Sequence, residues 1–305
     1  MARAARPPVV VLGSTGSGKS DVAMAAAQAV PGTEIVAVDA MQVYRGMDIG
    51  TAKPTPEDRA IVRHHGIDLV DPDEPFGVTD YVAAYDAATG AIGERDGRAL
   101  LVAGTGLYLT AVIDRLEIPD RYPDARAALD GDPDTPRLHA RLAALDPVAA
   151  GRIEPGNRRR VIRALEVSIG SGRPFSSFGP GLDAYPPTEA TLIGLRWPRH
   201  RLAERIERRV DQMMTAGLLD EVRRVRIGGM SRTAAQALGY KELLLHLDGV
   251  VDLDAAVALI VQRTRQYAVR QERWFRRDPR IRWIDIRDDP ASEVSGVVSA
   301  TLTHH

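Results

Sequence analysis

Residues 13–20 of the chain read G-S-T-G-S-G-K-S, which matches the pattern G-x-x-x-x-G-K-[ST], and they directly follow an apolar run. Glycines let the backbone fold around an anion with its N–H groups pointing inward, and a helix that starts near Gly18 adds the positive end of its dipole. Lys19 supplies a point charge, and the hydroxyl of Ser20 can ligate Mg²⁺. The pattern predicts a P-loop for a diphosphate or triphosphate, as in ATP binding; an ordinary glycine-rich turn would leave Lys19 and Ser20 unexplained. The predicted phosphate-binding residues are Gly13, Ser14, Thr15, Gly16, Ser17, Gly18, Lys19 and Ser20, and the predicted metal ligand is Ser20.

Two further polar residues follow apolar runs, Asp39 after residues 34–38 and Thr105 after residues 99–103. Ligands of an open parallel sheet lie beyond the carboxyl ends of its strands, so both residues should lie beside the P-loop. Asp39 would act as a general base or a metal-linked carboxylate, or it caps the next turn. Thr105 stands between two glycines and offers one hydroxyl donor, or it only ends a tight turn. No acidic residue follows residues 99–103, where an NTP-hydrolysing enzyme usually carries one, so transfer of another kind is favoured.

The elements that must hold these residues follow from the apolar pattern. Alternation of strands and helices along the first hundred residues indicates an α/β fold, a P-loop NTPase-like parallel sheet flanked by helices. The expected strands are residues 8–12, 34–38, 99–103, 191–196 and 281–286, and the expected helices are 19–30, 81–95, 136–145, 201–216, 218–226 and 254–277.

Prolines cluster and strands vanish after residue 117. We therefore expect a P-loop core domain with C-terminal helices, formed by residues 1–117 and 157–305. Residues 118–156 would form a small all-helical insert, whose end could reach about residue 185.

The composition limits the setting of this chain. It has 305 residues, 44% of them hydrophobic, and a net charge of −1, so RNA binding would have to come from local patches. It lacks cysteine, which excludes disulfides and cysteine metal sites and suits a reducing compartment. Residues 1–6 are too short for a signal peptide, and no apolar run approaches the ~20 residues that span a membrane. We expect a soluble cytoplasmic protein without a membrane partner, and a monomer.

Together these motifs resemble the bacterial tRNA dimethylallyltransferases, the tRNA isopentenyltransferase family. The most specific match is residues 39–54, similar to the family's D-S-x-Q-V-Y and I-G-T-A-K-P; residues 104–108 match G-T-G-L-Y, and residues 205–213 match R-I-x-x-R-V-D-x-M. The resemblance runs from Val9 to about Trp283. Ser14 replaces the family's usual proline, and Ala40 its usual serine, which puts one hydrogen bond to substrate in doubt.

The resemblance implies transfer of the dimethylallyl group from dimethylallyl diphosphate to N6 of the adenosine at position 37 of tRNA, just 3′ of the anticodon. The P-loop would then hold the diphosphate of the donor, together with Mg²⁺. Asp39 matches the family's general base, Thr105 the donor to the bridging oxygen, and Lys19 and Arg209 the groups on the diphosphate. These four are the predicted catalytic residues.

The acceptor base must leave the stack to reach Asp39. The resemblance assigns tRNA contact to the loop after the second strand, to the arginine-rich run after residue 157, and to residues 236–241. A second arginine-rich helical face with interleaved aromatic residues adds Arg270 as a candidate. The predicted residues are Asp39, Ala40, Met41, Gln42, Arg159, Arg160, Val161, Ile162, Arg163, Gln236, Gly239, Tyr240, Lys241 and Arg270. Either arginine run alone would suit a solvated helix face, and the roles of His64 and His65 stay open.

Two rival functions share some of these features. A P-loop small-molecule or nucleotide kinase would also have the parallel core and a helical lid, but it requires ATP turnover and predicts no affinity for tRNA. A non-catalytic RNA-binding protein could use the P-loop as a nucleotide switch.

Overall fold

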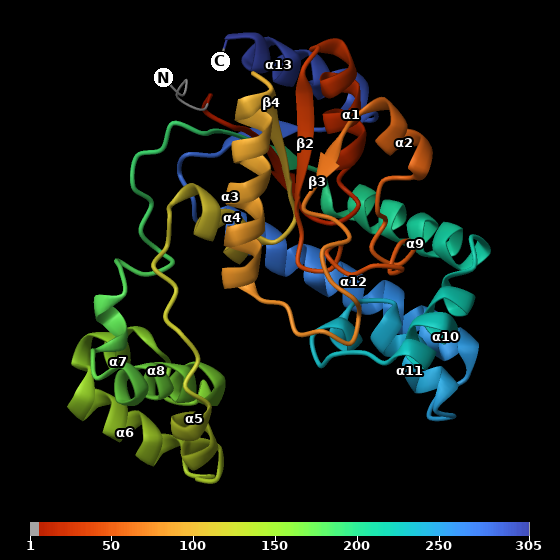
Figure 1. Ribbon diagram of the computed structural model, residues 1–305. Coiled ribbons are helices and arrows are strands. Elements are labelled where there is room, and N and C mark those ends of the chain that lie inside the picture. Colours follow the sequence, from red (N-terminus) through yellow and green to blue (C-terminus); the bar gives the residue numbers. More distant parts are fainter. Residues whose placement is uncertain (1–5, 305) are drawn as a thin grey trace. The chain divides into compact units, whose positions relative to one another are not determined.

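The computed structural model describes residues 6–304 and divides them into two compact units (Figure 1). The core unit comprises the chain up to Ile113 and from Pro187 onward, and the insert unit comprises Asp114–Pro186. The predicted lack of a signal peptide concerns a segment that lies, except for Arg6, outside the described residues. In the described part of the chain no helix combines the length and the apolar character needed to cross a membrane.

The core unit is built on one sheet of six parallel strands in the order β3-β2-β4-β1-β5-β6. The five predicted strands are confirmed, whereas the two-residue β3 gives too short a pattern to be recognised. Since β2, β4 and β1 are neighbours, the loops that follow them share one edge of the sheet. The strands are β1 Val9–Gly13, β2 Thr33–Val38, β3 His64–His65, β4 Arg98–Ala103, β5 Thr191–Arg196 and β6 Arg282–Asp285.

Helices cover both faces of this sheet (Figure 1). Val10 and Leu12 of β1 point to the face covered by α3 and α4, while Val9 and Val11 point to the face covered by α1 and α13. All four are wholly buried, which explains why the strand is a continuous apolar run. This is the predicted P-loop NTPase-like arrangement. The core helices are α1 Lys19–Ala29, α2 Pro56–Ile61, α3 Val78–Glu94, α4 Gly106–Ile113, α9 Arg199–Thr215, α10 Leu218–Gly228, α11 Tyr240–Leu247, α12 Leu253–Phe275 and α13 Pro290–His304.

The insert unit contains α5 Pro123–Asp130, α6 Thr135–Leu145, α7 Pro147–Arg152 and α8 Arg158–Ser171. Its own apolar core joins Leu138 and Leu142 of α6 to Val161 and Leu165 of α8. The insert therefore extends past residue 156, the shorter of the two predicted ends, and agrees with the longer predicted end near residue 185, because α8 packs within it. Its buried face looks, in sequence, like that of any helix packed on the sheet.

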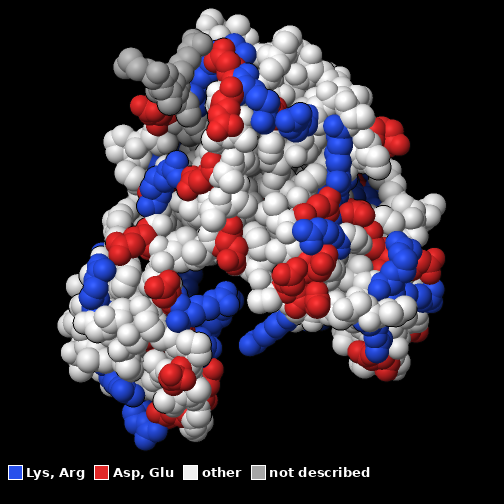
Figure 2. Space-filling view, in the orientation of Figure 1, with Lys and Arg blue, Asp and Glu red and all other residues white. Residues whose placement is uncertain are grey.

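Charges of both signs are interspersed on the face of the molecule shown in Figure 2, in keeping with the net charge of −1. No single sign dominates that face, so any attraction for a nucleic acid there depends on local groups.

A buried carboxylate joins α10 to the turn after the second strand. Glu221 is 2% exposed and accepts the backbone N–H groups of Asp48, Ile49 and Gly50 at 3.0, 2.8 and 3.0 Å. It also accepts the hydroxyl of Tyr240 at 2.5 Å. One carboxylate thus satisfies four donors, and it fixes the end of the segment that begins at the carboxyl edge of β2.

Glu221→Gln is expected to lower the free energy of unfolding by about 2–4 kcal/mol, because an amide cannot accept all four donors and buried unpaired donors are costly. Urea denaturation followed by circular dichroism measures the change. The control is Asp220→Asn in the same turn of α10, where an exposed ion pair with Arg223 contributes little. Equal stability of the two variants would contradict the structural role of Glu221.

Candidate active site

The P-loop joins the end of β1 to the start of α1 and has the conformation that its glycines allow. Gly16 and Gly18 have φ angles of 78° and 85°, in the left-handed region that favours glycine. Lys19 opens α1 and folds back so that its Nζ donates to the carbonyl of Ser14 at 2.9 Å. The first N–H groups of α1 have no partner within the helix, so they can bind an anion.

Two side chains hold the P-loop from outside. The indole of Trp197, just after β5, donates to the carbonyl of Ser17 at 3.0 Å. Arg205 of α9 donates through Nε to the carbonyl of Gly16 at 2.9 Å and stacks over the Trp197 ring at 4.6 Å. Neither residue was a predicted site residue, although Arg205 lies one helical turn before Arg209 and thus on the same face.

The carboxylate and the hydroxyl predicted for the site meet beside the P-loop. The hydroxyl oxygen of Thr105 accepts the backbone N–H of Ala40 at 3.1 Å, and Oδ1 of Asp39 accepts that of Met41 at 2.8 Å. A methyl group built on Gly104 would lie 3.3 Å from Oδ2 of Asp39 and 3.9 Å from Cε of Lys19. The loops after β1, β2 and β4 therefore bring Lys19, Asp39 and Thr105 to one place.

Arg209, the fourth predicted catalytic residue, lies on α9 and completes a positive pair with Lys19. Desolvation by burial and then the charge of Arg209 lower the pKa of Lys19 to about 8, against the opposing effect of Asp39. Burial likewise lowers the pKa of Arg209, opposed by the carboxylates of Asp39 and Asp21. Two poorly solvated cations beside the N-terminus of a helix form a site suited to an anion of multiple charge.

Binding of inorganic pyrophosphate is expected to take up protons at pH 8.5. With a pKa of about 8, well below the ordinary 10.5, most Lys19 amines of the free protein are neutral at this pH. The bound anion raises this pKa again, so the amine regains roughly 0.7 of a proton, and affinity falls as the pH rises above 8. Calorimetry in two buffers of different ionisation enthalpy measures the uptake.

Lys19→Met is the control for this measurement, because it keeps the stem but has no titrating amine. Subtracting its proton uptake removes the protonation of pyrophosphate itself. The same uptake by both proteins would contradict the lowered pKa of Lys19.

Helix α12 adds side chains that were not predicted as site residues. Tyr267 has its pKa raised to about 12 by burial and then by the charge of Asp39, while hydrogen bonding to Thr105 and Gln271 opposes the shift. The Trp274 ring covers Gly106 so closely that no side chain would fit there. These residues lie far from the P-loop in sequence, and only their place in a helix with many arginines distinguished them.

The predicted tRNA contacts of the core unit divide into accessible and buried groups. Tyr240 is wholly buried with its hydroxyl on Glu221, so its side chain supports the fold, and tRNA contact at this position stays a prediction. Gln236 is exposed and accepts from Nζ of Lys241 at 2.9 Å. Arg270 is exposed too, 5.7 Å above the ring of Tyr267.

Some other residues of the core unit that were predicted to contact tRNA stabilise the local backbone. Gln42 donates through Nε2 to the carbonyls of Thr51 and Ala52, both at 3.1 Å, which engages its amide nitrogen within the loop. Ala40 and Met41 are partly exposed beside Asp39. Gly239 is buried at the N-terminus of α11 with a φ of 89°, a conformation that a larger residue would adopt with strain.

In the insert unit, the predicted run of residues 159–163 on α8 lies partly toward solvent and partly toward the insert's own apolar core. Arg159 and Arg160 are exposed, whereas Val161 and Ile162 are at most 1% exposed and pack within the unit. Arg163 donates to the carbonyls of residues 119 and 120 and pairs with the carboxylate of residue 166. The side chains of Val161 and Ile162 are therefore part of the insert's apolar core, because an amphipathic helix buries part of any continuous run, and tRNA contact by this run stays a prediction.

A metal ion would need ligands beyond the protein. The described residues contain no group of three or more His, Cys, Asp or Glu side chains that could hold one. Ser20 is exposed in the first turn of α1 and offers one hydroxyl oxygen. Since Mg²⁺ commonly binds few protein oxygens and completes its shell with phosphates and water, these residues fit Mg²⁺ held jointly with a diphosphate.

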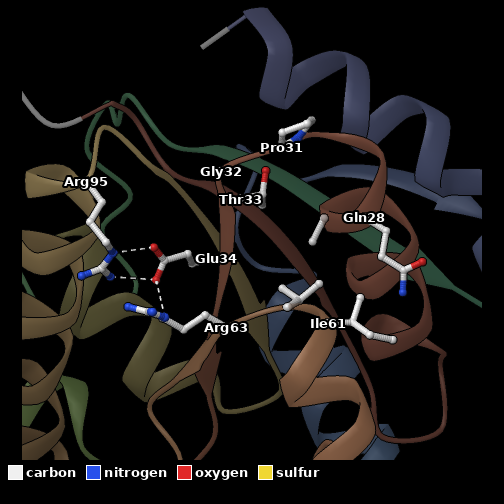
Figure 3. A pocket seen from close by; sticks show the side chains of 10 residues that line it. Gln28, Pro31, Gly32, Thr33, Glu34, Ile61, Arg63 and Arg95 are labelled. Carbon is white, nitrogen blue, oxygen red and sulfur yellow. Dashed lines mark hydrogen bonds and ion pairs between the residues drawn. The ribbon is translucent and has the colours of Figure 1, made fainter.

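A separate pocket lies at the other edge of the sheet, where β2 begins (Figure 3). Its lining includes Thr33, Glu34 and Arg95, and Glu34 accepts two hydrogen bonds from Arg95 at 2.9 and 2.8 Å. Nε2 of His65 lies 2.7 Å from the same carboxylate, and Nδ1 of His64 lies 2.8 Å from a backbone carbonyl. Glu34 is thus paired with Arg95 and His65 at the start of β2, whereas the P-loop lies at the opposite, carboxyl edge of the sheet.

Comparisons with known proteins show which family the chain belongs to. A family model described as IPP transferase matches residues 42–278. The chain belongs to the IPP transferase family. It is 45% identical over 295 residues to a tRNA dimethylallyltransferase of Kineococcus radiotolerans, with 92% of each chain covered. A second family relative, a tRNA dimethylallyltransferase of Paenarthrobacter aurescens, is 45% identical over 304 residues, covering 98% of this chain and 97% of its own.

Solved structures agree with this family and its fold. The full-length tRNA isopentenylpyrophosphate transferase of Bacillus halodurans is 37% identical and has a TM-score of 0.70, covering 98% of this chain and all of its own. A eukaryotic dimethylallyltransferase, described as acting on tRNA, has a TM-score of 0.82 over 98% of this chain and 80% of its own. At 23% identity, the latter supports the fold alone.

Proposed function

We propose that this protein transfers the dimethylallyl group of dimethylallyl diphosphate to N6 of adenosine 37 of tRNA, giving N6-(dimethylallyl)adenosine. The observation that carries this proposal is the meeting of an anion-binding loop, the hydroxyl of Thr105 and the carboxylate of Asp39 at one edge of the sheet. Membership of the IPP transferase family supports it, and so does the lack of an acidic residue directly after β4.

The donor's diphosphate would bind at the P-loop, on its N–H groups and on Lys19 and Arg209. Negative charge builds on the bridging oxygen as the bond to the allylic carbon breaks, and donors fixed in advance stabilise that charge. Thr105 is suited to this task. Its oxygen already accepts the N–H of Ala40, and its own proton, which is also within hydrogen-bonding reach of Tyr267, can be donated to the bridging oxygen. When bound at Ser20 and the diphosphate, Mg²⁺ would supply further positive charge to the leaving group.

The acceptor amine is a weak nucleophile, because its lone pair is delocalised into the adenine ring. Asp39 would take the proton from N6 as the new C–N bond forms, after the base has left the stack. The exposed Arg159, Arg160 and Arg270 and the partly exposed Lys241 would contact the tRNA backbone and bases. ATP would compete for the P-loop without being turned over.

The donor site lies within one chain, so a monomer suffices for the reaction, and a tRNA substrate implies work in the cytoplasm. The test incubates the protein with labelled dimethylallyl diphosphate, Mg²⁺ and an unmodified anticodon stem-loop with an A-rich 3′ flank. Label in the adenosine after the anticodon supports the proposal. Absence of label, with ATP hydrolysis or phosphoryl transfer to a small molecule, would refute it and favour a kinase.

A further inference from the structure

One amide side chain joins the two loops that hold the donor. Oε1 of Gln271 accepts the backbone N–H of Thr15 in the P-loop at 2.8 Å, and its Nε2 donates to the carbonyl of Gly104 at 2.7 Å. Gln271 is only 6% exposed, and these partners lie 256 and 167 positions away along the chain. The side chain therefore bridges the loop after β1 and the loop after β4, across two adjacent strands.

The two contacts fix which way the amide points, because one partner is a donor and the other an acceptor. A methyl group built on Gly104 would lie 3.5 Å from Nε2 of Gln271 and 3.3 Å from Oδ2 of Asp39, so the amide lies beside the predicted base. It also removes the N–H of Thr15 from the donors free to bind phosphate. Gln271 thus fixes the separation of the two loops, and it uses one P-loop N–H to do so.

The same helix connects this bridge to the surface. Tyr267 lies one turn before Gln271, and its pKa is raised by burial and by the charge of Asp39 and lowered by a hydrogen bond with Thr105. Arg270 directly precedes Gln271 and is exposed. Trp274, three residues after it, covers Gly106. One side of α12 therefore faces the reacting groups, and another side carries a predicted tRNA contact.

We propose that Gln271 is a positioning residue: it holds the P-loop and the Gly104–Thr105 turn at a fixed separation, so that a diphosphate in the loop meets the hydroxyl of Thr105 and the carboxylate of Asp39. The expected effect on transfer rests on the proposed function, whereas the expected effect on pyrophosphate binding does not. Misplacement of reacting groups by about 1 Å can cost roughly 100-fold in rate.

The test uses Gln271→Met, which keeps the length and volume of the side chain but neither hydrogen bond. Its matched control is Gln262→Met, the same change at an exposed position of α12. The deciding measurement is calorimetric affinity for inorganic pyrophosphate with Mg²⁺. We expect Gln271→Met to bind roughly 10-fold more weakly and the control to bind as the wild type does. Wild-type affinity in Gln271→Met would overturn the proposal.

Single-turnover transfer separates positioning from general damage to the fold. In correctly folded Gln271→Met, measured per pyrophosphate-binding site, kcat should fall roughly 10- to 100-fold while KM for the stem-loop stays within about twofold. A loss confined to KM for the RNA would overturn the proposal and assign Gln271 to tRNA binding. If the wild type itself transferred no label, the proposed function would fail, and the pyrophosphate measurement would still decide the role of Gln271.

Discussion

Asp39→Asn is expected to lower kcat for dimethylallyl transfer by about 10²- to 10⁴-fold, the usual contribution of a general base. The amide has the shape of the carboxylate, and its oxygen can still accept the N–H of Met41, now bonded at 2.8 Å. The loop therefore keeps its conformation and loses only the group that takes the proton. Pyrophosphate should bind as well or more tightly, since removing this negative charge weakens the internal counter-charge to Lys19 and Arg209, to which Asp21 still contributes.

Single-turnover rates at saturating donor and stem-loop give the measurement, and calorimetry gives the affinity for pyrophosphate. The control is Asp71→Asn, at an exposed loop position where the carboxylate pairs with Arg45. A kcat for Asp39→Asn within about fivefold of the wild type would exclude proton transfer to this carboxylate. Loss of pyrophosphate binding instead would mean that Asp39 maintains the conformation of the P-loop site.

The parts of the site that the sequence revealed are those that depend on local pattern. Strands buried on both faces appear as apolar runs, and the residues directly after them lie at one edge in any parallel sheet, whatever the strand order. Lys19, Asp39 and Thr105 could therefore be placed together before the order β3-β2-β4-β1-β5-β6 was known. The turn and helix signals around the P-loop required nothing from the rest of the chain.

Gln271 and Trp197 could not be found in this way, because their partners lie 167 or more positions away. Nothing in the neighbourhood of either residue signals a contact with the P-loop. The predicted tRNA-binding surface was limited in another way. The run on α8 was predicted as one continuous contact, although the helical period buries the side chains of Val161 and Ile162. The burial of Tyr240 could not be predicted either, because its hydrogen-bond partner Glu221 lies on another helix.

Thr105→Val is expected to lower kcat by about 10²- to 10³-fold, the cost of removing one fixed donor to a developing negative charge. Valine has the same shape but cannot donate to the bridging oxygen, and it leaves the N–H of Ala40 without its acceptor. Because that charge develops only as the bond breaks, KM for dimethylallyl diphosphate should change by less than about threefold. Thr105→Ser restores the hydroxyl and should recover activity to within about 10-fold of the wild type.

The control for this pair is Thr110→Val, the same change in α4 at a buried threonine whose hydroxyl bonds to the carbonyl of Gly106 within its own helix. It tests whether a lost hydroxyl and a small local strain are enough to slow transfer. If Thr105→Val and Thr110→Val had equal kcat, the donor role of Thr105 would be wrong. If the serine variant failed to recover, the methyl group that positions the hydroxyl would matter as much as the hydroxyl itself. A loss specific to Thr105→Val and reversed by serine would place a proton donor at the leaving oxygen, directly after β4, where an NTP-hydrolysing enzyme usually carries an acidic residue instead.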